Sequence, residues 1–172
     1  GNDLALGIYE LNRGEFDVTF GSGRTSTAID VIYGVGITWG NFDDNGFYAA
    51  INANKNENHD TDNIGRLIDK AVGLESLFSY QFDNEIRTFI SYNILDAGTN
   101  YVIQPNFNAD PNDNFKRQFV VVGLHYIFDP DTVIYVEARR DYNDFTSADK
   151  VQQARMELSE DDGIAIGIRY TL

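Results

Sequence analysis

Histidine, cysteine and paired acidic side chains most often perform catalysis or bind metals, and this sequence holds few of them in usable sets. It contains no cysteine and two histidines, His59 and His125. A thiolate nucleophile is therefore excluded, and zinc chemistry is not expected. Neither histidine lies in a recognisable catalytic motif. We therefore expect no enzymatic activity, no cofactor and no metal site of this kind.

One stretch partly matches a calcium-binding loop. Asp60 and Asp62 supply acids at its first and third positions, and Gly65 stands at the sixth. The fifth position is Ile64 and the twelfth is Ala71, where such a loop needs an oxygen ligand and a bidentate glutamate. The ordinary interpretation is a solvated acidic loop, and a calcium-binding loop is the alternative.

The elements that position these residues are strands, because hydrophobic side chains recur at every second position. The alternation is clearest from Ile29 to Trp39 and from Ile164 to Leu172. It predicts one all-β domain over 1–172, and 148–158 is either a short helix or an irregular loop. Nine antiparallel strands are expected, at 3–11, 15–21, 27–40, 46–54, 70–82, 85–95, 117–128, 132–141 and 163–172.

Short and long connections alternate along the chain. Gly, Asn, Asp and Pro predict tight turns at 12–14, 43–46, 83–84 and 129–131. The other connections are 22–26, 55–69, 96–116 and 142–161, of which the last three are long and acidic. This alternation favours an up-and-down transmembrane β-barrel, with short turns at one end and long loops at the other.

The two faces of the predicted strands differ in chemistry. One face is apolar, ends in aromatic residues and is expected to meet lipid; in strand 15–21 it holds Phe16, Val18 and Phe20. Glu15 and Asp17 are assigned to the opposite, polar face. Mixed charges on that face would bias which ions pass a water-filled lumen. The expected pore-lining residues are Glu75, Arg87, His125, Glu137, Arg139 and Arg169.

The overall charge and hydropathy limit the possible partners. The chain holds 27 acidic and 13 basic residues, a formal net charge of -14, so nucleic acid is not an expected partner. No apolar run approaches the roughly 18 residues of a membrane-spanning helix. A soluble β-sandwich or lipocalin-like barrel is the alternative to a membrane barrel. Strands of 10 to 14 residues and aromatic strand ends argue against it.

Three stretches resemble the general porins of Gram-negative outer membranes: Val72–Leu95, Phe119–Arg140 and Asp161–Leu172. The resemblance extends over about residues 65–172. It implies a 16-stranded outer-membrane barrel, usually a homotrimer, that contacts lipid and lipopolysaccharide and passes small hydrophilic solutes. The nine predicted strands would then be the last nine of that barrel.

The sequence departs from the porin pattern in two places. The closing strand ends in Leu172 where the family normally has Phe, and the acidic constriction loop with its basic counterpart has no match here. Nine strands would also leave an open edge, which lipid does not tolerate. Either the strand count is wrong by one in 1–26, or the chain is the C-terminal part of a longer barrel, the interpretation we favour.

The expected function is therefore a passive channel for small hydrophilic solutes and ions. The three long loops together hold twelve acidic and five basic residues, which predicts a weak preference for cations. One alternative is a solute-specific channel, for example for oligosaccharides, with Tyr9, Tyr48, Phe89 and Tyr135 as stacking surfaces. The other is a small closed barrel with a structural or adhesive role.

Overall fold

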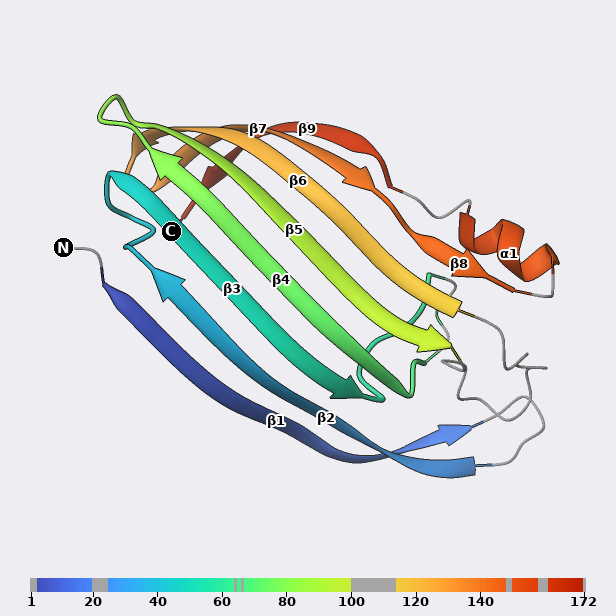
Figure 1. Cartoon of the computed structure of the whole chain (residues 1–172). Coiled ribbons are helices and arrows are strands. Elements are labelled where there is room, and N and C mark those ends of the chain that lie inside the picture. Colours follow the sequence, from blue (N-terminus) through green and yellow to red (C-terminus); the bar gives the residue numbers. More distant parts are fainter. Residues whose placement is uncertain are drawn as a thin grey trace.

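A computed structural model describes residues 3–19, 25–63, 65, 67–99, 114–147, 150–157 and 161–171. Long strands in antiparallel meander order β1-β2-β3-β4-β5-β6-β7-β9 form one sheet, and the short β8 pairs with β6 (Figure 1). The all-β, up-and-down arrangement is thus confirmed. The elements are β1 (Leu4–Thr19), β2 (Thr25–Trp39), β3 (Gly46–Glu57), β4 (Lys70–Gln81), β5 (Ile86–Thr99), β6 (Asn114–Asp129), β7 (Thr132–Asp141), β8 (Asp144–Thr146), α1 (Lys150–Glu157) and β9 (Gly163–Tyr170).

The sheet is curved but not closed. Figure 1 shows β7 and β9 turning behind β5 and β6, while β1 and β2 run along the opposite side. Within the described residues, β1 and β9 are the two edges, each paired with one neighbour along the meander. The part of the prediction that concerns a closed barrel therefore goes beyond the observed sheet.

The predicted turn at 12–14 is wrong, because β1 is one strand with a bulge. Asn12 pairs with Val31 and Gly14 pairs with Asp30, so Arg13 is an extra residue in the ladder. Gly14 has a φ of +85°, which glycine adopts without steric cost. The described sheet therefore has eight long strands and the short β8, and the count in 1–26 was one strand too high. The argument from an odd strand number no longer holds.

The bulge also reverses which face each later residue of β1 occupies. Phe16 lies opposite Ala28, on the side of the sheet that carries Asp30, whereas Glu15 lies opposite Ile29. The assignment of Phe16 to the apolar face and of Glu15 and Asp17 to the polar face is therefore wrong. Phe20 and most of the predicted connection 22–26 lie outside the described residues.

The other predicted tight turns are confirmed, whereas the long connections are shorter than predicted, because β3 extends to Glu57, β5 extends to Thr99 and β6 begins at Asn114. Tight turns join β3 to β2, β5 to β4 and β7 to β6, and helix α1 lies within 148–158. Strand β8 was not predicted. Residues 100–113, in the middle of the loop predicted at 96–116, lie outside the described part of the chain. No helix in the described residues is long and apolar enough to span a membrane.

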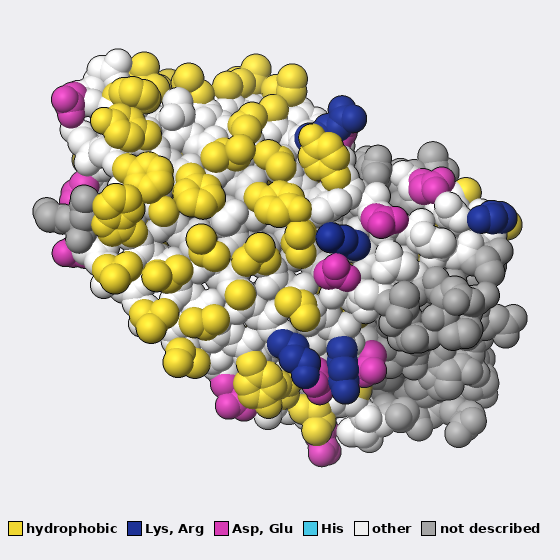
Figure 2. Space-filling model, in the orientation of Figure 1, with side chains coloured by type: hydrophobic (Ala, Val, Ile, Leu, Met, Phe, Trp, Pro, Cys, Tyr) yellow, Lys and Arg dark blue, Asp and Glu magenta, His cyan; other side chains and the backbone are white. Residues whose placement is uncertain are grey.

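Two faces of opposite character result from this register. Figure 2 shows hydrophobic side chains spread across the strands, with Lys and Arg side chains gathered toward the end that carries β8 and α1 and acidic ones at both ends. By the ladder register the apolar face also carries Ile8, which is 84% exposed, and Ile166, which is 79% exposed. Aromatic rings contact one another at the turn end of the same face, as in the pairs Trp39 with Phe47 and Tyr80 with Phe82. The predicted aromatic strand ends are therefore in place.

A small hydrophobic cluster lies at the loop end of the sheet. Phe115 of β6 is fully buried, and Ile68, from the connection between β3 and β4, is 1% exposed. They pack with Ala71, Leu95 and Phe145. The connection 58–69 is thereby fastened over the end of the sheet.

Candidate functional site: the polar face of the sheet

All six predicted pore-lining residues lie on the face of the sheet opposite the exposed apolar side chains. Arg87 lies directly across from His125, and the ladder continues in the same phase through β7 to β9. This face is the concave one, because a single cavity is lined jointly by residues of all the strands from β1 to β6. The six are Glu75, Arg87, His125, Glu137, Arg139 and Arg169.

Arg87 is held close to the turn end of the sheet. Its guanidinium lies 3.9 Å from the ring centroid of Phe42, and Nη2 donates a 2.6 Å hydrogen bond to the Phe42 carbonyl oxygen. Nε and Nη2 also donate to the side-chain oxygen of Gln81. With 5% of its surface exposed, Arg87 fastens the turn after β2 and presents little charge to solvent.

His125 and Glu137 form a pair across β6 and β7. His125 Nε2 lies 2.8 Å from Glu137 Oε1, and the imidazole is flanked by the rings of Phe89 and Tyr135. A histidine and an acid are two members of a hydrolytic triad, and the third member is a nucleophile such as serine. No serine or threonine lines the cavity at His125 among the described residues.

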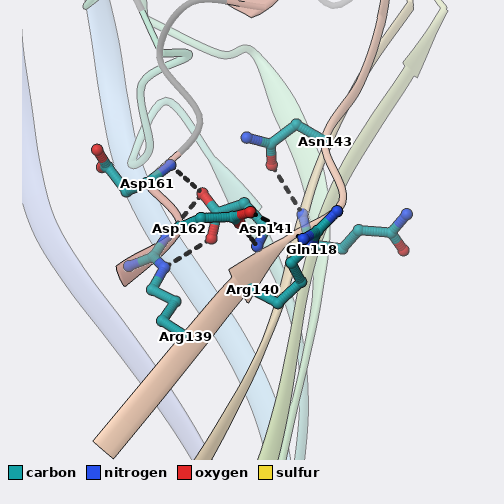
Figure 3. A network of polar contacts seen from close by, with 7 residues as sticks. All are labelled: Gln118, Arg139, Arg140, Asp141, Asn143, Asp161 and Asp162. Atoms are coloured by element: carbon teal, nitrogen blue, oxygen red, sulfur yellow. Dashed lines mark hydrogen bonds and ion pairs between the residues drawn. The ribbon is translucent and has the colours of Figure 1, made fainter. Parts of the chain in front are cut away.

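Asp141 is the centre of a network at the loop end of β7 (Figure 3). Arg139 Nε donates to Asp141 Oδ1 at 2.6 Å, and the backbone amide of Asp161 donates to Oδ2 at 3.1 Å. The Asp141 amide donates to Asp162 Oδ1 at 2.8 Å, and Arg140 lies 3.2 Å from Asp162 Oδ2. The network fastens the start of β9 to the end of β7.

The electrostatics of Asp141 follow from these contacts. Asp141 lies beyond the apolar residues of β7, because its neighbour Arg140, which projects from the opposite face, is a charged residue. Burial raises the pKa of the Asp141 carboxyl, but hydrogen bonds from Arg139 and the Asp161 amide, together with the charge of Arg139, lower the pKa below its ordinary value. The carboxylate is thus held ionised by its neighbours.

Glu75 belongs to a second cluster, made mainly of amides. It accepts a 3.4 Å hydrogen bond from Asn52 Nδ2, and Asn52 Oδ1 accepts one of 3.1 Å from the Tyr9 hydroxyl. Asn54 and Asn56 follow on the same face of β3. Sequence reasoning did not assign this row as a site, although Asn at every second position of a strand is a signal that could have identified it.

The connection 58–69 covers this cluster from the loop end. Asp60 accepts a 2.6 Å hydrogen bond from Asn56 and lies 3.9 Å from Arg117, while His59 Nδ1 lies 2.8 Å from Asp30. Asp60 therefore already contacts an amide and a cation. No group of three or more His, Asp or Glu side chains placed to hold a metal occurs in the described residues.

The polar face thus combines four arginines with four carboxylates at positions facing a common concave surface. Most of these charges are paired, as Arg139 is with Asp141 and Glu137 is with His125. Such a surface can solvate ions and polar molecules without binding one charge strongly. The arginines are Arg87, Arg117, Arg139 and Arg169, and the carboxylates are Asp30, Glu75, Glu137 and Asp141. No known protein-family model matches the chain.

Proposed function

We propose that this chain forms the wall of an outer-membrane β-barrel channel that passively conducts small hydrophilic solutes and ions. The observation that carries the proposal is the inverted distribution of side chains. The concave face is polar and charged, while large apolar residues such as Ile8 and Ile166 are exposed on the convex face. In water that face would have to be covered, whereas lipid is a suitable solvent for it.

The dimensions of the apolar face support the same proposal. On β6 the apolar row runs from Val120 to Phe128, about 26 Å along the strand at roughly 3.3 Å per residue. At a tilt of about 40° this row covers roughly 20 Å of the membrane normal, close to the apolar band of about 25 Å in such barrels. Aromatic rings mark the turn end of the row, where an interfacial belt is expected.

The cellular setting follows from this proposal together with the resemblance to general porins. A barrel of this type lies in the outer membrane of a Gram-negative bacterium, in contact with lipid and lipopolysaccharide, and is a homotrimer in that family. It acts as a channel and performs no catalysis. A closed barrel requires that the edges β1 and β9 be paired, because unpaired strand edges are not stable in lipid.

Planar-bilayer recording tests the proposal directly. The purified chain, folded into lipid, should give stepwise conductance, and liposomes that contain it should swell in sugars below a size limit. Stepwise conductance, together with a swelling rate that falls smoothly as the sugar becomes larger, supports a general channel. A protein that inserts into lipid but stays electrically silent would instead favour the structural or adhesive barrel.

A further inference from the structure

A cavity of about 350 Å³ lies on the concave face, toward the loop end of the sheet. Its walls come from all the strands from β1 to β6, and the connection after β3 contributes to its rim. Of the six predicted pore-lining residues it includes only Glu75. Its volume is near the lower end of the roughly 300–1,000 Å³ typical of small-molecule sites. The cavity therefore has room for one small solute.

The floor of the cavity is a row of amides. Asn52, Asn54 and Asn56 alternate along β3, so all three side chains project from the same face. An amide has an acceptor oxygen and two donor hydrogens. Asn52 is already bonded to Tyr9 and Glu75, and Asn56 to Asp60, so the remaining capacity of the row is what the hydroxyl groups of a solute can use. Asn54 Oδ1 is enclosed and has no hydrogen-bond partner in the described structure. The Asn54 side chain that carries this buried, unpartnered acceptor lines the cavity wall.

A glycine makes room for this amide. A β-carbon built at Gly73, directly opposite Asn54 on β4, would lie 2.4 Å from Asn54 Oδ1. Residue 73 must therefore lack a side chain if the Asn54 amide is to lie where it does.

Aromatic rings border the amide row on two sides. Tyr9 reaches across Gly34 of β2 to bond with Asn52, and the residue is 39% exposed. Phe119 of β6 lines the other side of the cavity. Binding sites that combine a few placed polar groups with apolar and aromatic walls suit molecules that have both polar and apolar surface.

The charges at the cavity do not favour an anion. Asp60 faces Arg117, and His59 faces Asp30, so these rim charges are offset locally. Glu75 remains as a carboxylate within the cavity and disfavours anions. An anion is therefore disfavoured, and the amide row favours a ligand rich in hydroxyl groups.

We propose that this cavity is a binding site for a neutral mono- or disaccharide, with amides of β3 bonding its hydroxyls and Tyr9 packing against its C–H face. The inference deepens the proposed channel function, since it names a solute class that would bind during passage. It makes the channel saturable for such solutes instead of purely size-selective.

Calorimetric titration of the folded chain in detergent micelles tests the site without requiring conductance. Glucose and maltose are the neutral probes, and glucose 6-phosphate is the anionic one. We expect saturable binding of a neutral sugar and weaker binding of the phosphate. Asn54→Leu and Tyr9→Ala should each lower the affinity about tenfold, as expected for loss of a hydrogen bond or a packing surface.

Two glycine variants provide a matched pair. Gly73→Ala forces the Asn54 amide to move and should lower the affinity, whereas Gly36→Ala meets only ordinary contacts of 3.7 Å or more and should not. Far-UV circular dichroism checks that each variant is folded. Absence of saturable sugar binding, or equal binding by the wild type and folded Asn54→Leu, overturns the site even when conductance is intact. Sugar binding by an electrically silent protein would overturn the channel and leave the site in place.

Discussion

The ring of Tyr135 on β7 covers the backbone of Gly167 on β9, so closely that a β-carbon at Gly167 would lie 2.6 Å from the tyrosine hydroxyl oxygen. The two residues are directly opposite in the ladder. Phe89 covers Gly123 in the same way between β5 and β6. An aromatic ring over a glycine on the neighbouring strand lets a sheet curve toward that face, since no side chain separates the ring from the wall.

A methyl group at one of these glycines should therefore displace the ring. In Gly123→Ala the new β-carbon would lie 2.1 Å from Phe89 Cε1, so the ring must turn into the concave space. We expect a loss of roughly 1–3 kcal/mol in the free energy of unfolding, as for other overpacked sites. Gly7→Ala is the control because nothing lies within 4 Å of its β-carbon. Urea titration in lipid vesicles measures the free energy of unfolding of both variants. Equal stability of the two would contradict the close packing of the Phe89 ring on Gly123.

The exposed row on β9 makes a second prediction. Ile166 projects from the apolar face and Ala165 from the polar face, opposite Glu137. Ile166→Arg should cost about 2–4 kcal/mol if it lies near the bilayer midplane, whereas Ala165→Arg should keep stability and change conductance. The folded fraction in lipid at increasing urea distinguishes the two variants. Equal damage at both positions would mean that this face does not meet lipid.

Much of this arrangement could be predicted from the sequence. Where hydrophobic residues recur at every second position without interruption, the apolar face of the strand is identified and the remaining residues must lie on the other face. The run from Ile164 to Arg169 is such a case, and its face assignment is as predicted. The bulge at Arg13 was not predictable in this way. Asn12, Arg13 and Gly14 have the composition of a tight turn, and a glycine with positive φ serves a turn and a bulge equally well.

The candidate site was predictable only in part. Charged residues such as Glu137 and Arg139 stand out against apolar neighbours, so their common face was found. The amides of β3 are uncharged and were not recognised as a group. The burial of Ile68 depends on contacts with Phe115 and Phe145, which are far away in sequence, so no local pattern indicates that the connection 58–69 folds over the sheet.

The network around Asp141 makes a third prediction. Because folding lowers the pKa of this carboxyl, the carboxylate stabilises the β7–β9 end above its unfolded pKa of about 3.9. That contribution is lost as the pH falls through the lower folded pKa. Asp141→Asn should cost about 1–3 kcal/mol at neutral pH, since Arg139 loses its ionic partner.

Limited proteolysis of the segment between β7 and β9 measures this effect at neutral pH with trypsin and at acid pH with pepsin. The wild type should be cleaved more slowly than Asp141→Asn at neutral pH, and the difference should vanish at acid pH. Asp129→Asn, at the opposite end of β6, is the control and should match the wild type under both conditions. A difference between wild type and Asp141→Asn that persists in acid would assign the protection to another contact.

The last prediction concerns ion preference, which rests on the proposed channel. The charged residues of the concave face offset one another, so the excess of acidic side chains in the long loops should decide the sign. Cations should be preferred weakly at low ionic strength and hardly at all near 1 M salt, because the Debye length there is about 3 Å. Glu137→Gln should shift the reversal potential toward anions by leaving Arg139 and Arg169 less compensated, and Arg169→Gln should shift it the opposite way. The ion preference of the wild type and of the two variants is measured as the reversal potential under a salt gradient. Identical potentials for the two variants would mean that neither Glu137 nor Arg169 faces the conducting path.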